Sequence, residues 1–226
     1  EKISARPDAL EQWLSDERDS ERVAAILENL IDQPAPRIRG SLFSVVGEKE
    51  NSTGNRVTAL AALVRGLDEA SEDHLLTLAG SVEGGPVLAE VLRSLAGLGI
   101  RSEMNHKDPA SLGAATPYKP SDKIRKQAAK VLLRELNAAD PAVRTAALEA
   151  ATELQVGGAG KAASGLLGDD HAGVRSAAAR AVGKLRESSA VEPLLNLARD
   201  RDAAVRVASF ESLRLLGERR SVPLAI

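Results

Sequence analysis

Aromatic side chains are scarce in this chain. Its 226 residues include one Trp, one Tyr and two Phe, which is 2% of the total. β-Sandwiches and barrels depend on aromatic and β-branched residues, so this shortage argues against them. The sequence instead has 38 Ala and 31 Leu, two of the strongest helix formers. The composition therefore predicts an all-α fold in which small side chains let helices approach closely.

Cysteine is also absent, which excludes disulfides, thiolate zinc sites, iron–sulfur clusters and thiol catalysis. No apolar run is close to the length of about 18 residues that a helix needs to cross a bilayer, so we expect no membrane span. A chain without cysteine fits the cytoplasm as well as the periplasm or a secreted state, and the localisation stays open.

The net charge of −2 is unevenly spread. Residues 1–117 have 12 Lys/Arg and 19 Asp/Glu, whereas residues 118–226 have 18 and 13. This asymmetry is either random surface variation or the sign of an acidic half and a basic half with different partners.

A repeat with a period of 31 residues dominates the second half. Its copies begin at Asp140, His171 and Asp202, and each predicts an amphipathic helix with a shorter helix before it. Such a pair cannot bury its apolar faces alone, so successive pairs must stack. The matched columns are Val143/Val174/Val205, Arg144/Arg175/Arg206, Ala146/Ala177/Ala208 and Leu154/Leu185/Leu216.

The first half follows the same scheme less regularly. We divide the chain into divergent repeats over 1–100, an insertion over 101–121 and regular repeats over 122–226, which form one continuous solenoid. A short helix is expected within the insertion, over 108–115. The helical patterns of the first half cover 7–14, 20–31, 36–46, 56–67, 72–79 and 86–98.

The pattern Asp-x-x-Val-Arg-x-x-Ala-Ala, followed by an apolar helix, resembles the HEAT repeat. The short period resembles the phycobilisome-lyase-like subclass of that family. The likeness is clear over 122–217 and weak over 1–100. It implies an α-solenoid of about 12–14 helices that binds proteins, usually without catalysis. His171 stands where the pattern has Asp. The second repeat therefore lacks the aspartate of the family's Asp/Arg pair at this position, and the partner of its arginine stays open.

Two carboxylates and three arginines recur with this architecture. We interpret Asp140 and Asp202 as helix N-caps. Arg144, Arg175 and Arg206 are expected to form a structural ladder, bonding either the capping carboxylate or the backbone of a neighbouring repeat. The alternative is a row of arginines that binds anionic ligands.

A basic stripe follows Tyr118. Lys123, Lys126, Lys130 and Arg134 share one helix face, which is either a solvated face or a docking stripe for an acidic protein or a phosphate backbone. Nucleic-acid binding is disfavoured because the chain is slightly acidic and has few aromatics to stack on bases.

We expect the second helices of successive pairs to present the main contact surface for a protein partner. Trp13, at apolar spacing with Leu10 and Leu14, either caps the first repeat or anchors a partner. The candidate positions on the second helices are Thr145, Glu149, Ser176, Arg180, Val207, Glu211 and Arg214.

These patterns predict a non-catalytic scaffold for protein–protein interaction with no catalytic residue, cofactor or metal. The Gly157–Gly160 segment lacks the Lys-Ser/Thr pair of a phosphate loop. A third, lower-ranked interpretation is that the protein is a helical-repeat lyase or glycosylase, which needs an aromatic or acidic pocket on the concave face.

The main alternative to an independent scaffold is that the chain is a HEAT-like domain of a larger protein. The chain begins with Glu1 rather than Met, and Ser221-Val-Pro-Leu resembles the start of a new first helix. We therefore expect the natural polypeptide to continue, with other domains as possible partners. The family resemblance extends to modules of bacterial envelope proteins with sugar-dehydrogenase-like propellers and c-type cytochrome domains.

Overall fold

A computed structural model describes residues 7–30, 35–64, 69–107 and 122–218 of the chain. These ranges contain twelve α-helices, one short 3-10 helix and no strand, so the predicted all-α class is confirmed. The chain forms two compact units, Glu1–Val91 and Leu92–Ile226.

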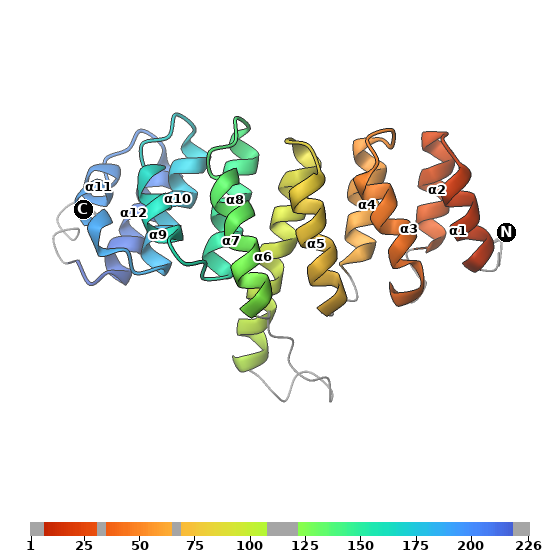
Figure 1. The fold of residues 1–226 in the computed structure, drawn as a ribbon. Coiled ribbons are helices and arrows are strands. Elements are labelled where there is room, and N and C mark those ends of the chain that lie inside the picture. The colour runs from red at the N-terminus through yellow and green to blue at the C-terminus, as the bar shows by residue number, and fades with distance from the viewer. Residues whose placement is uncertain (1–6, 31–34, 65–68, 108–121, 219–226) are drawn as a thin grey trace. The chain divides into compact units, whose positions relative to one another are not determined.

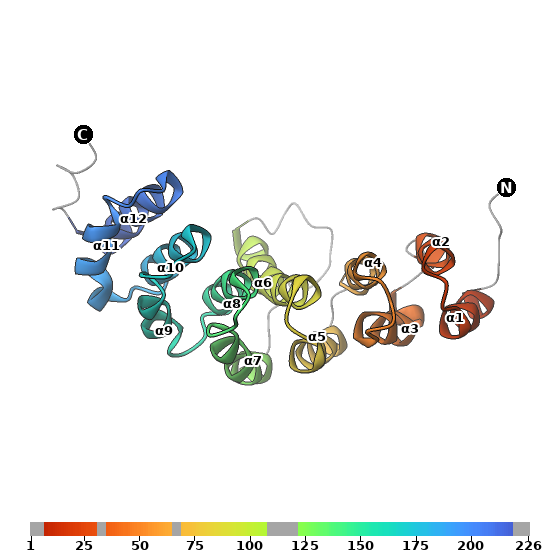
Figure 2. The same cartoon turned by 90° about the horizontal axis from the view of Figure 1, so that it is seen from above.

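The first unit consists of antiparallel helix pairs in two layers. Helices α1, α3 and α5 form one layer, and α2 and α4 form the other (Figures 1 and 2). Helix α6 begins in this unit and continues into the second. The bounds are α1 Pro7–Asp16, α2 Ser20–Leu30, α3 Ala35–Gly47, α4 Thr53–Leu63, α5 Glu69–Ser81 and α6 Pro86–Lys107.

All six helices expected in the first half are therefore present. Helix α6 extends to Lys107, so the first residues of the expected insertion over 101–121 are helical. The short helix expected over 108–115 and the side chain of Tyr118 lie outside the described residues.

The second unit repeats the same arrangement with higher regularity. Helices α7, α9 and α11 form one layer, and α8, α10 and α12 form the other, on the inner side of the bend of this unit (Figure 2). The second-layer helices begin 31 residues apart. The bounds are α7 Asp122–Glu135, α8 Pro141–Glu153, α9 Ala159–Gly165, α10 Ala172–Lys184, α11 Val191–Leu197 and α12 Ala203–Leu215, with the 3-10 helix at Ser188–Ala190.

Aspartate N-caps fix where two of these helices begin. The Asp140 side chain accepts the backbone N–H of Ala142 at 2.8 Å, and Asp202 accepts that of Ala204 at the same distance. Both aspartates have extended backbone angles, as N-cap residues do. These two caps begin their helices at the same position of the repeat.

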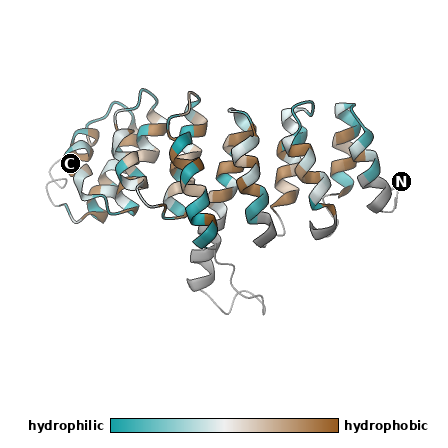
Figure 3. Ribbon diagram, viewed as in Figure 1, coloured by the Kyte–Doolittle hydropathy of each residue, from teal (hydrophilic) through white to brown (hydrophobic). Residues whose placement is uncertain are grey.

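The core is built mainly from Leu, Val and Ala, and the helices carry both apolar and polar residues (Figure 3). Ala146, Ala177 and Ala208 occupy one column of the repeat and are at most 4% exposed. Small side chains there let α8, α10 and α12 pack closely, which is the reason we expected for the Ala-rich composition. The Ser212 hydroxyl even reaches the neighbouring helix and donates to the carbonyl of Ala179 at 2.6 Å.

Helices α10 and α12 approach each other closely at Gly183 and Ser212. A Cβ placed on Gly183 would be 2.5 Å from the Ser212 Oγ and 2.8 Å from its Cα. The Cα belongs to the backbone and cannot rotate away. Only glycine therefore fits at this crossing of the two helices.

We predict that Gly183→Ala lowers the free energy of unfolding by about 1–3 kcal/mol, because the added methyl group overpacks the α10–α12 contact. Urea unfolding followed by circular dichroism measures this. Gly173→Ala, in the same helix but with open space around its Cβ position, is the control and should raise stability by roughly 0.4–1 kcal/mol, because alanine loses less backbone entropy on folding than glycine does. Equal effects of the two substitutions would contradict the packing argument.

Candidate protein-binding surface

Arg144 links two successive repeats. Its Nε and Nη2 donate to the two carboxylate oxygens of Asp169, both at 3.0 Å. Its Nη1 donates to the carbonyls of Ala138 and Ala139 at 2.7 and 2.9 Å. The guanidinium thus joins the loop before its own helix to the loop before α10. We call such an arginine–carboxylate pair between repeats a rung.

Arg175 makes the same set of bonds one repeat further on. Its Nε and Nη2 donate to Asp200 at 2.8 and 2.9 Å, and its Nη1 donates to the carbonyls of Asp169 and Asp170. In both rungs the side chains are mostly buried. Bidentate, charge-assisted and partly buried bonds are among the strongest polar contacts in proteins.

Each rung carboxylate also orders the loop in which it lies. Oδ1 of Asp169 accepts the backbone N–H of His171 at 2.9 Å, and Oδ1 of Asp200 accepts that of Asp202 at 2.8 Å. His171 makes no side-chain cap bond. The second rung is nevertheless intact, because its carboxylate is Asp200 and not a residue at the cap position.

Burial and the arginines act in opposite directions on these carboxyl groups. Burial opposes ionisation of Asp169, but the hydrogen bonds from Arg144 and His171 hold its pKa below the ordinary value. For Asp200 the hydrogen bonds from Arg175 are the largest influence, and they also lower the pKa. Both rungs are therefore ion pairs at neutral pH.

The first unit contains a third rung that the sequence reasoning missed. Arg56, 3% exposed, binds both carboxylate oxygens of Glu83 through Nη1 and Nη2, and its Nε donates to the carbonyl of Val46 at 2.9 Å. Arg56 is the fourth residue of α4, as Arg144 is of α8. Glu83 precedes α6 by three residues, as Asp169 precedes α10.

The partners of the arginines differ from our expectation. Asp140 and Asp202 cap their helices, and their carboxylates accept no hydrogen bond from the arginines four residues later. Arg206 donates through Nη1 to the carbonyls of Asp200 and Arg201. The signal that identifies the true partners is a further column at the 31-residue spacing, Ala138/Asp169/Asp200.

We predict that Asp169→Asn destabilises the protein by about 1–3 kcal/mol, because the mostly buried Arg144 loses its counter-charge and one of the two carboxylate oxygens that accept from it. Thermal and urea unfolding measure the change. Asp170→Asn is a matched control, because Asp170 is exposed and no side-chain bond of it is recorded among the described residues. Comparable destabilisation by both variants would show that the rung has no special weight.

Acid should weaken the rung of the first unit. The hydrogen bond from Arg56 lowers the pKa of Glu83 to about 2, below its value of about 4.3 in an unfolded chain. The stabilisation is therefore present above about pH 4.5 and is lost as the pH falls toward 2. The stability difference between wild type and Glu83→Gln should shrink over this range. A difference that stays constant from pH 5 to pH 2 would contradict the assignment.

The outward positions of the second-layer helices form the surface that we call the second-helix face. Glu149 of α8, Arg180 of α10 and three residues of α12, Val207, Glu211 and Arg214, are exposed there. Val207 is 55% exposed, unusual for a large aliphatic side chain. The face thus combines charges of both signs with an apolar contact.

Two positions expected on this face contribute less to it. Ser176 is 3% exposed, and its hydroxyl donates to the carbonyl of Ala204 at 3.3 Å. It belongs to the α10–α12 contact, where the helices approach too closely for an outward side chain. Thr145 is half-buried, and its hydroxyl donates to the carbonyl of Pro141.

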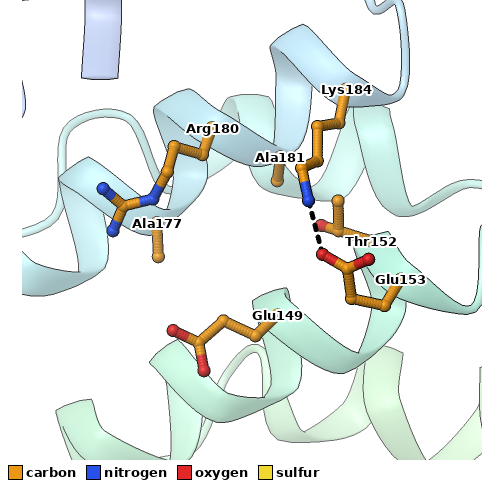
Figure 4. A pocket seen from close by; sticks show the side chains of 7 residues that line it. All are labelled: Glu149, Thr152, Glu153, Ala177, Arg180, Ala181 and Lys184. Atoms are coloured by element: carbon orange, nitrogen blue, oxygen red, sulfur yellow. Dashed lines mark hydrogen bonds and ion pairs between the residues drawn. The ribbon is translucent and has the colours of Figure 1, made fainter. Parts of the chain in front are cut away.

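A small groove lies on this face between α8 and α10 (Figure 4). Glu149 and Arg180 border it from opposite helices. One end is closed by the ion pair of Lys184 with Glu153, at 2.5 Å. The other lining residues are Thr152, Ala177 and Ala181.

The other predicted binding residues lie elsewhere. Lys123, Lys126, Lys130 and Arg134 are exposed on α7, in the first-helix layer of the second unit. Arg134 pairs with Glu135 at 2.7 Å. Trp13 of α1 is 51% exposed, whereas its neighbour Leu14 is buried.

The described ranges hold no group of three or more His, Asp or Glu side chains that could bind a metal ion. None of the helices described is long and apolar enough to cross a membrane.

The stacked antiparallel helix pairs define a repeat protein of the α-solenoid class. Residues 161–225 match the model of the family described as HEAT repeats, and the resemblance seen in the sequence is confirmed over this segment. The assignment to the phycobilisome-lyase-like subclass of short HEAT repeats stays a prediction.

Solved structures with similar folds include a designed armadillo repeat protein and an engineered protein. A designed armadillo repeat protein in complex with the peptide (KR)4 has a TM-score of 0.63 and 16% identity, covering 94% of this chain and 100% of that one. An engineered protein has a TM-score of 0.59 and 20% identity, with coverage of 92% and 96%. A comparison with curated proteins found no match.

Proposed function

We propose that this protein is a non-catalytic scaffold that binds a segment of a partner protein on the second-helix face of α8, α10 and α12. The observation that carries the proposal is the exposure on this one face of Glu149, Arg180, Val207 and Glu211. These side chains project from helices whose mutual register is fixed by the buried rungs. A surface prepared in this way loses little conformational entropy on binding.

The chemistry of the face supports a peptide-like ligand rather than a reaction. The groove between α8 and α10 is small and is lined by two glutamates, two cations, a threonine and two alanines. The residues that border it offer hydrogen-bond acceptors and donors side by side, which suits the amide groups and polar side chains of a polypeptide. Val207 offers an apolar contact on the neighbouring helix α12.

The fold comparison agrees with this use. Repeat solenoids present extended surfaces along which a partner can lie, and one of the structurally similar designed proteins holds a peptide. The α7 stripe around Lys126 and Lys130 is a second surface of the same unit. It serves as an internal comparison, because it lies in the opposite helix layer.

We expect a displayed library of random 12-residue peptides, selected on the full chain, to yield binders that depend on the second-helix face. The variant Glu149→Ala/Arg180→Ala/Glu211→Ala should weaken their binding by roughly tenfold or more, because a few residues dominate such contacts. Fluorescence anisotropy with labelled peptides measures the affinities.

Lys126→Ala/Lys130→Ala is the matched control and should leave these affinities within about twofold of wild type. Binders that are lost in the α7 variant and retained in the triple variant would place the interaction on the basic stripe. A library that yields no binder sensitive to the triple variant would refute the proposal.

A further inference from the structure

Equivalent residues of neighbouring repeats lie side by side on the second-helix face. The clearest evidence is the ion pair between Lys184 and Glu153, which are 31 residues apart and 2.5 Å from each other. Residues one helical turn earlier must then be aligned as well. This places Glu149, Arg180 and Glu211 in one row that crosses α8, α10 and α12.

The row at Glu149, Arg180 and Glu211 differs from the row next to it. Lys184 and Glu153 neutralise each other, whereas Glu149 and Arg180 stand on opposite sides of the groove (Figure 4). Within the described parts of the chain, no ion pair or side-chain hydrogen bond is recorded for the three residues. All three are exposed, so the row presents acid, base and acid to an incoming ligand.

The spacing of this row matches the repeat of an extended polypeptide. Helices in contact lie about 8–10 Å apart, and α10 contacts both α8 and α12. A polyproline-type chain rises about 3.1 Å per residue with three residues per turn. Side chains three residues apart in such a chain therefore point the same way and are separated by about 9 Å, close to one helix spacing.

We propose that the second-helix face recognises an extended peptide segment carrying a basic, an acidic and a basic side chain at positions i, i+3 and i+6. The two basic side chains contact Glu149 and Glu211, and the acidic one contacts Arg180. This inference rests on the proposed function and adds the charge pattern of the ligand to it.

Arg180 is the residue that makes the pattern selective. A uniformly basic segment would place a cation against this guanidinium, and a uniformly acidic one would place carboxylates against Glu149 and Glu211. Like-charge contacts of this kind discriminate between partners more effectively than they add affinity. Because the pattern is symmetric, it allows either direction of the peptide chain.

The test compares two capped peptides with the full chain by fluorescence anisotropy at low salt. One is Lys-Pro-Ser-Glu-Pro-Ser-Lys, and the other is its charge inverse, Glu-Pro-Ser-Lys-Pro-Ser-Glu; the prolines favour the extended form. We expect the first to bind about tenfold more tightly, since three exposed ion pairs each contribute modestly. The variant Glu149→Lys/Arg180→Glu/Glu211→Lys should reverse the preference.

Equal affinities of the two peptides, no measurable binding of either, or an unchanged preference in the charge-reversed variant would each overturn this inference. The library selection separates this failure from that of the proposed function. Selected peptides that depend on the second-helix face but lack the charge pattern would reject the pattern alone. The absence of any peptide that depends on the face would reject both.

Discussion

The bidentate contact between an arginine and a carboxylate of the next repeat is the interaction on which the stacking of successive helix pairs depends. Arg144–Asp169 and Arg175–Asp200 have the same atoms in the same arrangement, and Arg56–Glu83 is their counterpart in the first unit. The guanidiniums of Arg144 and Arg175 each hold a loop on either side, whereas Arg56 joins the end of α3 to the loop before α6. Hydrophobic contact is non-directional, so packing alone would leave the stagger between helix pairs poorly defined.

This stagger determines what the outer surface displays. When α8, α10 and α12 are fixed in register, single exposed residues such as Glu149, Arg180 and Glu211 become a row with a defined spacing and sign. The buried alanines and Gly183 contribute by bringing the helices close enough for such a row to form. The same repeat thus supplies both the buried contacts between helices and the exposed row of charges.

The sequence predicts most of the fold and less of the surface. The helices and their 31-residue period follow from apolar spacing and from the Val-Arg and Ala columns, because helix periodicity is a local property. The partner of Arg144 is 25 residues away, a distance that intra-helix spacing rules do not address. Arg56 and Glu83 were missed because the first-half repeats lack the motif, and Ser176 was misplaced because ideal helix faces ignore how closely two helices approach.

A double-mutant cycle of Arg175→Met and Asp200→Asn tests the central claim most directly. If the rung holds neighbouring repeats together, each single variant loses stability, and the double variant loses less than the sum of the two. The coupling energy from urea unfolding should then be about 1–3 kcal/mol. A coupling energy near zero would show that the arginines and carboxylates act independently, and the ladder would not be what sets the register of the second-helix face.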